Sequence, residues 1–250
     1  MMEQPDFLPG VPADRVLARL AKAGGNEVES GKLLSPQSSA ALAVNTFGWF
    51  VERPALFPPL PGMDAAMPPI GVDVEYCARF PWRGGRHPWL DAVVETAERL
   101  IGVESKRFEP FRDRKTASLS AAYDRPVWGD GMAPYERLRD SLRSGAEAFA
   151  HLDAVQLVKH AFGLVTDGRR RGKTASLVYL YAEPAAIAGR PIPASTFDRH
   201  RDEIARFATL TAGAAVTFQA ISYRDWIATW PASGSAVAAH GAAILARFAP

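Results

Sequence analysis

Two acidic residues and a lysine, carried by two neighbouring apolar segments, are the residues of this sequence best suited to catalysis. Asp91 lies in the first segment, and Glu104 and Lys106 end the second. Side chains alternate along a strand, so Glu104 and Lys106 project from one face and Ser105 from the other. If residues 97–98 form the tip of a hairpin, Asp91 lies across from Glu104, with Cβ atoms about 5 Å apart. A slip of one residue would send Asp91 to the opposite face.

Two directly opposed carboxylates repel each other unless a cation lies between them. Magnesium suits such a place, because it binds one or two carboxylates and completes its shell with water and substrate phosphate. Lys106 adds a positive charge that can hold a water nucleophile or an anionic transition state. These residue types therefore suit metal-assisted phosphodiester hydrolysis. The competing interpretation is a solvated hairpin with an ordinary surface ion pair.

A family resemblance rests on the same residues. Asp91 followed by Glu104-Ser105-Lys106 on the next strand resembles the PD-(D/E)xK nuclease superfamily, and the run GVESKRFEPF at 102–111 looks like a group of bacterial restriction endonucleases. The resemblance covers about residues 25–185 and is specific around 88–114. One departure is that the literal Pro-Asp pair is absent, since two residues separate Pro88 from Asp91.

The resemblance implies a restriction-endonuclease-like α/β fold, with a core in the order α-β-β-β-α-β and a mixed central sheet flanked by helices. It implies that Asp91, Glu104 and the Ser105 carbonyl bind Mg²⁺, with Mn²⁺ as the alternative ion. Lys106 would position the attacking water.

Further candidates come from the two core helices. An acidic residue of the first core helix supplements the metal site in the superfamily, which points to Glu27 ahead of Glu29. Both could equally be solvated loop acids. A polar residue of the second helix, first Gln156 and then Lys159, would reach toward the site. The histidines of this region, His151 and His160, are expected at the helix surface.

Basic residues near these elements are candidates for holding a phosphate backbone. The candidates are Arg107, Arg112, Arg114, Lys115, Arg169, Arg170, Arg171 and Lys173. Glu109 and Asp113 interrupt the first group, so a mixed-charge surface explains it equally well. The second group forms a loop of the kind that is often only solubilising.

The elements that must position these residues follow from periodicity, caps and breakers. We expect core strands at 71–78 and 174–183 besides the hairpin, and a buried helix that begins with Ser35 as N-cap and Pro36 at its first position. The second core helix is expected at 152–163 and should stop near Gly163 or Gly168. A C-terminal extension should contribute a helix at 196–211, a strand at 215–223 and a helix at 235–248.

Composition narrows the class of protein. The chain has 250 residues, of which 48% are hydrophobic and 22% charged, with a net charge of +2. The lone Cys77 excludes internal disulfides and Cys-rich zinc sites and agrees with a reducing cytoplasm. The chain begins without a signal-peptide pattern and contains no apolar run of membrane-spanning length, so we expect a cytoplasmic protein without membrane contact.

We therefore predict one restriction-endonuclease-like domain over 1–250, with its core at about 25–185 and a C-terminal helix-strand-helix extension at 186–250. The predicted function is a magnesium-dependent endonuclease that cleaves DNA in restriction or defence. The predicted partners are DNA, a second copy in a homodimer, and a cognate methyltransferase encoded nearby. The alternatives are a non-cleaving nucleic-acid-binding module that kept the fold, and a metal-free carboxylate-pair hydrolase acting on sugars.

Overall fold

The computed structural model describes residues 6–23, 31, 33, 35, 37–63, 68–113, 115, 118–231 and 235–250. Three residues that the sequence suggests as functional, Glu27, Glu29 and Arg114, lie outside these ranges. Within the described ranges, no helix combines the length and the apolar character needed to cross a bilayer.

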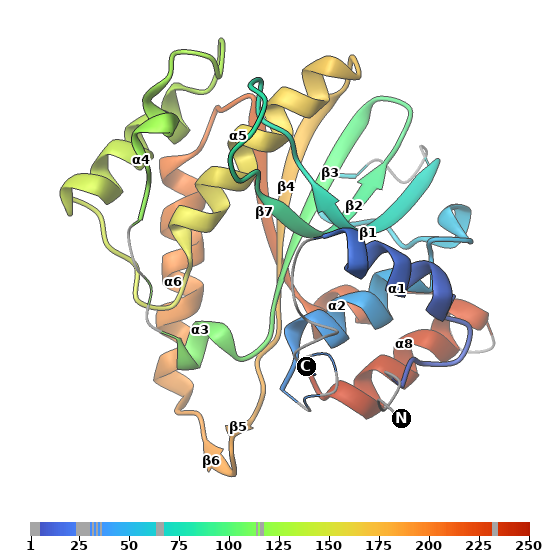
Figure 1. Ribbon diagram of the computed structural model, residues 1–250. Coiled ribbons are helices and arrows are strands. Elements are labelled where there is room, and N and C mark those ends of the chain that lie inside the picture. Colours follow the sequence, from blue (N-terminus) through green and yellow to red (C-terminus); the bar gives the residue numbers. More distant parts are fainter. Residues whose placement is uncertain are drawn as a thin grey trace.

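A five-stranded sheet divides the molecule into two layers of helices (Figure 1). Its strand order is β1-β2-β3-β4-β7. The strands are β1 (Gly71–Cys77), β2 (Trp89–Glu95), β3 (Arg99–Lys106), β4 (Thr174–Tyr181) and β7 (Val216–Ser222). The pairs β1-β2 and β2-β3 are antiparallel, whereas β3-β4 and β4-β7 are parallel. The predicted mixed sheet of an α/β protein is therefore confirmed.

The hairpin between β2 and β3 has the predicted register. Ala92 pairs with Val103 and Glu95 with Leu100. The Thr96 N–H donates to the Arg99 carbonyl at 3.0 Å, which leaves residues 97–98 as the tip. Continuing this register places position 91 opposite position 104.

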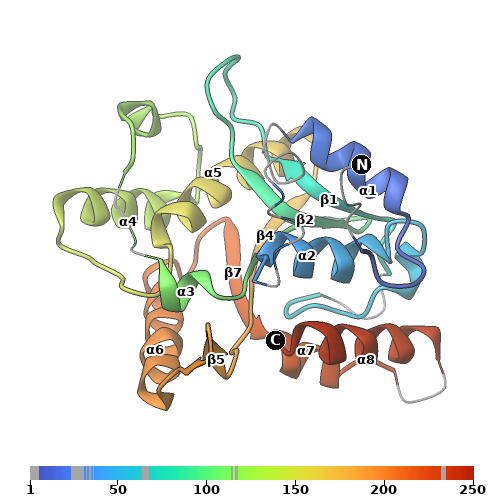
Figure 2. The ribbon, with the colours of Figure 1, turned by 60° about the horizontal axis from the view of Figure 1, so that its bottom comes forward.

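One face of the sheet carries the N-terminal and C-terminal helices together (Figure 2). They are α1 (Ala13–Lys22), α2 (Ser39–Gly48), α7 (Tyr223–Ala228) and α8 (Ala236–Phe248). The prediction that α2 begins at Ser35 is wrong, because Ser38 has the extended backbone of an N-cap and its side chain accepts the Ala41 N–H. The aromatic residues of this segment, including Phe47 and Phe50, are buried core residues.

The other face is covered by α5 (Ala154–Arg170), with α4 (Ala133–Ser144) and α6 (Ala194–Leu210) outside it (Figure 2). The helix α5 runs through both glycines at which the sequence predicted a stop. A Cβ at Gly163 would lie 2.7 Å from the Ala78 Cβ, and one at Gly168 would lie 2.9 Å from the Lys173 carbonyl oxygen. These glycines thus allow close packing of α5 on its neighbours.

Shorter elements complete the chain. They are α3 (Glu109–Arg112), the 3-10 helices η2 (Pro54–Leu56) and η3 (Ala121–Asp124), and the small hairpin of β5 (Ala186–Ile187) and β6 (Arg190–Pro191). The C-terminal helix-strand-helix pattern is present, and its strand β7 joins the central sheet beside β4. The short helix α7 between β7 and α8 has no counterpart in the predicted elements.

Candidate active site

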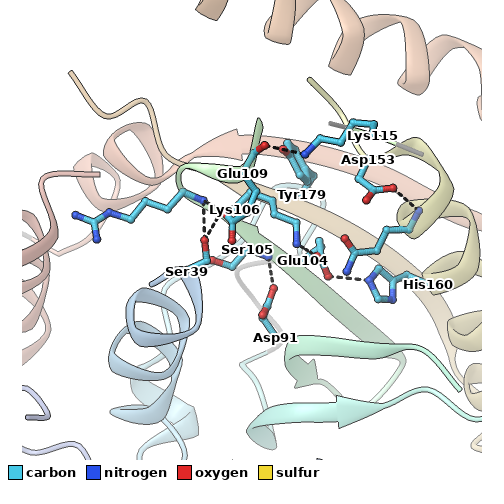
Figure 3. A network of polar contacts seen from close by, with 12 residues as sticks. Ser39, Asp91, Glu104, Ser105, Lys106, Glu109, Lys115, Asp153, His160 and Tyr179 are labelled. Carbon is cyan, nitrogen blue, oxygen red and sulfur yellow. Dashed lines mark hydrogen bonds and ion pairs between the residues drawn. The ribbon is translucent and has the colours of Figure 1, made fainter. Parts of the chain in front are cut away.

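The two carboxylates and the lysine gather where β3 ends, on the sheet face that α5 covers (Figure 3). The Lys106 ammonium forms an ion pair with Oε1 of Glu104. On β2, Oδ2 of Asp91 accepts the Ser105 N–H at 2.6 Å. The Ser105 hydroxyl lies on the opposite face, 2.6 Å from the Tyr223 hydroxyl. Asp91 is thus tied to the backbone of the strand that carries Glu104 and Lys106.

A histidine completes this cluster. Nε2 of His160 lies 2.7 Å from Oε2 of Glu104, and each side chain is only 2% exposed. The expectation that His160 lies at the helix surface is therefore wrong. Gln156 and His160 are four residues apart and so share a face of α5, and this spacing is the sequence signal that could have identified the histidine.

The electrostatics separate the roles of the three groups. Burial raises the pKa of Glu104, but Lys106 and His160 outweigh it and lower the pKa to about 2. Burial and the Glu104 charge raise the pKa of Asp91 well above its ordinary value. For Lys106, burial lowers the pKa, but the Glu104 and Asp91 carboxylates raise it more strongly. These directions favour an ionised Glu104 paired with a protonated Lys106.

The donor set fits a hard divalent ion. The carboxylates of Asp91 and Glu104 supply the kind of protein oxygens that Mg²⁺ commonly takes. Among the described residues, no group of three or more His, Cys, Asp or Glu side chains could hold a metal. Further ligands would therefore include water, substrate phosphate or a backbone carbonyl such as that of Ser105.

The Glu109 carboxylate fixes the turn after Lys106, although in the sequence Glu109 only interrupts a run of basic residues. Oε2 of Glu109 accepts the Ser39 hydroxyl at 2.5 Å and the backbone N–H groups of Arg107 and Phe108 at 3.1 Å each. The Glu109 carboxylate connects the end of β3 to the first residue of α2. It therefore positions β3, which carries Lys106 and is called the lysine strand below. No sequence motif marks such a contact between distant segments.

The first group of predicted phosphate-binding residues is only partly available to DNA. Arg107 is 6% exposed, donates to the Phe248 carbonyl and lies over the Phe108 and Phe248 rings, so its predicted phosphate contact is wrong. Arg112 is exposed and pairs with Asp113 at 2.7 Å. Lys115 donates to the Glu109 carbonyl at 2.7 Å, near the cluster (Figure 3).

The second group, at 169–173, lies at the far end of the sheet. Thr174 pairs with Arg99 and Tyr181 with Lys106, so the loop is about 20 Å along the strand from the lysine. The cations there contact other parts of the protein, as in the pair of Arg171 with Glu95 at 2.8 Å. The phosphate contact of this loop therefore stays a prediction, and it would hold the DNA backbone at a distance from the carboxylates.

The secondary candidates on α5 do lie beside the cluster. Gln156 and Lys159 line a cleft of about 510 Å³ together with His160. The other residues of its wall are Pro88, Trp89, Ser118, Asp153 and Val155. The candidate Glu27 belongs to the part of the chain that the structure does not describe.

Comparison with known proteins gives one match. A family model described as "Restriction Endonuclease associating with ARP" (REase-ARP) matches residues 13–247. No curated protein and no solved structure matches the chain. The matched range includes every described residue of the cluster.

Proposed function

The chain belongs to the family of restriction endonucleases associating with ARP, and on that premise we propose that it is a magnesium-dependent endonuclease that hydrolyses phosphodiester bonds in DNA. The family supports a nuclease of a restriction system. One observation carries the proposal to a mechanism: Asp91, Glu104 and Lys106 gather at the end of β3 with opposite charges in contact.

Each side chain has a distinct role in this proposal. Asp91 and Glu104 bind the ion, which when present lowers the pKa of a bound water and polarises the phosphate. Lys106 stays protonated, orients the water for attack at phosphorus and offsets the charge that develops there. His160 contacts the Glu104 oxygen that Lys106 does not, so it fixes the direction of the carboxylate.

The remaining partners stay predictions. The substrate is DNA, consistent with the family. We extend to this chain the association with ARP that the family description states. A homodimer, a cognate methyltransferase, Mn²⁺ as a replacement ion and a cytoplasmic location are further expectations from the sequence.

Cleavage of supercoiled, unmethylated plasmid DNA tests the proposal. The wild-type protein should nick or linearise the plasmid with Mg²⁺ or Mn²⁺ and stop when a chelator is added. Asp91→Asn should abolish cleavage, and Lys106→Met should lower the rate about 100-fold or more, because it removes a charge aimed at the transition state. Asp202→Asn is the matched control, since Asp202 is an exposed carboxylate on α6.

Thermal melts of the same variants separate lost chemistry from lost folding. Cleavage that survives the chelator, or Asp91→Asn protein that cleaves at the wild-type rate, would contradict the proposal. DNA binding without cleavage under every metal condition would instead support a non-cleaving binding module.

A further inference from the structure

The cleft of about 510 Å³ on α5 adjoins the carboxylate cluster through His160, which lines the cleft and contacts Glu104 at 2.7 Å. Trp89 also lines the cleft and precedes Asp91 by two residues on β2, about 7 Å along the strand. A strand of DNA whose phosphate reaches the cluster would therefore place its neighbouring nucleotide at this cleft.

The wall of the cleft offers three kinds of contact. The partly buried Trp89 presents an indole, and stacking of a base on an aromatic ring contributes about 1–3 kcal/mol. The Gln156 amide both donates and accepts hydrogen bonds, as reading of a base edge requires. Lys159 brings a cation suited to phosphate.

Lys159 and His160 both line the cleft and have polar atoms without a close polar partner among the described residues. Lys159 has no carboxylate in ion-pair range among the residues that the structure describes, and its ammonium lies 5.8 Å from the centre of the Tyr123 ring. Nδ1 of His160 is buried without a hydrogen-bond partner in the same part of the chain. Both residues line the cleft, so their polar atoms are candidates for contact with an occupant.

Asp153 is the one acidic residue among the described residues that line the cleft, and its contacts reduce its repulsion of an anionic occupant. Oδ1 of Asp153 accepts the Gln156 N–H at 2.9 Å and caps the N-terminus of α5. The positive end of the helix dipole thus offsets this carboxylate. The carboxylate also orients the first turn, which carries the Gln156 side chain into the cleft wall.

We propose that this cleft binds a single nucleotide of the DNA strand, next to the phosphodiester that is cut, with the base on Trp89, its edge at Gln156 and a phosphate at Lys159. The inference rests on the proposed function. It adds that the cleft sets the preference for the base next to the cleaved bond. The other walls, Pro88 and Val155, supply apolar contacts to the base or sugar.

Nucleotide binding without cleavage tests the cleft separately from catalysis. The full-length Asp91→Asn protein is mixed with each of the four deoxynucleoside 5′-monophosphates in a chelator, and saturation-transfer NMR detects contact with the base protons. At least one nucleotide should bind, and Trp89→Ala should weaken it about 5- to 100-fold, the equivalent of 1–3 kcal/mol. Trp89→Phe keeps a stacking ring and should retain most of the affinity.

Matched variants identify the contact. Gln156→Ala should reduce the preference among the four bases, whereas Gln219→Ala, an exposed glutamine on β7, should not. Inorganic phosphate should compete only weakly, because it lacks the base. Binding of phosphate with no base signal, or equal nucleotide affinity in Trp89→Ala, would overturn the inference.

Sequencing of cleaved ends distinguishes failure of the cleft from failure of the proposed function. Among the ends that Gln156→Ala protein produces, the base preference at the position beside the cut should be relaxed. Nucleotide binding that needs Trp89, in a protein that never cleaves DNA, would support the cleft and contradict the proposed function. If Gln156→Ala protein cleaves DNA with the wild-type base preference and no nucleotide binds, the proposed function is supported and the cleft inference is contradicted.

Discussion

Glu104 is held from both sides by basic groups in a place that water hardly reaches. Lys106 contacts one oxygen and His160 the other. A buried ion pair contributes little net stability, because desolvation of the charges offsets their attraction. Stability alone therefore does not explain the arrangement, whereas a fixed, ionised carboxylate is what a metal site requires.

His160 should tune the metal site through Glu104. We expect His160→Ala to lower Mn²⁺ affinity about 10-fold or more, the usual cost of losing a group that orients a ligand, as measured by titration calorimetry. His160→Gln should recover part of the affinity, because its amide can still donate to the carboxylate. His151→Ala is the control, since His151 is a partly buried histidine whose Nδ1 contacts the Pro110 carbonyl instead. Equal affinity in wild-type and His160→Ala protein would show that the histidine is only structural.

The hydroxyl of Ser39 should matter for stability and for cleavage together. It donates to Glu109 at 2.5 Å and accepts the Arg107 N–H at 3.0 Å, next to Lys106. Ser39→Ala leaves the partly buried Glu109 carboxylate short of a donor, so we expect a loss of about 1 kcal/mol in the free energy of unfolding. Urea unfolding measures this loss, and plasmid cleavage should slow because the lysine strand is less firmly held. A stable variant with wild-type cleavage would remove Ser39 from the positioning of the site.

At the scale of elements, the close approach of α5 to the sheet sets where His160 lies. Helix propensity favours Gly163→Ala by about 1 kcal/mol. The added Cβ, however, would meet the Ala78 carbonyl oxygen at 2.8 Å as well as its Cβ at 2.7 Å. We expect the clash to outweigh the gain in helix propensity and to lower the free energy of unfolding, measured in urea, by about 1–3 kcal/mol. Cleavage should also slow, because α5 shifts. A more stable Gly163→Ala protein would show that the helix can move aside freely.

The elements show what the sequence can and cannot predict. The hairpin register followed from strand alternation and a two-residue tip, which are local properties, and so the pairing of Ala92 with Val103 could be predicted. Gly163 looked like a helix stop because the sequence does not show Ala78 packed against it. The burial of Arg107 likewise depends on the carbonyl of Phe248, which is 141 residues away. Such contacts depend on tertiary structure that no local pattern encodes.

At the scale of the whole molecule, the two ends of the chain form one layer behind the site. α8 packs on α2, and Arg107, the residue after Lys106, donates to the last residue of α8. The family match spans both of these helices, so the layer belongs to the matched region. The C-terminal extension thus supports the lysine strand as well as enlarging the sheet.

The contact between α2 and α8 should make the fold sensitive to acid. His240 on α8 is 4% exposed, stacks on Trp49 with ring centres 5.0 Å apart and lies 3.3 Å from the Thr46 carbonyl. Burial lowers its pKa to about 4, the nearby Arg53 charge acts in the same direction, and hydrogen bonds to the carbonyls of Thr46 and Asn45 oppose the shift. The layer therefore holds a neutral imidazole.

Acid should consequently weaken the fold through this residue. An unfolded histidine has a pKa of about 6.5, so between that pH and about 4 the unfolded chain binds a proton that folded His240 does not. Its contribution is complete above pH 6.5 and is lost as the pH falls toward 4. Between pH 7 and 4.5 the loss should be about 2 kcal/mol, measured as the free energy of urea unfolding. His240→Gln should start less stable but show a correspondingly smaller fall with pH, whereas parallel pH curves for the two proteins would mean that His240 is protonated in the fold.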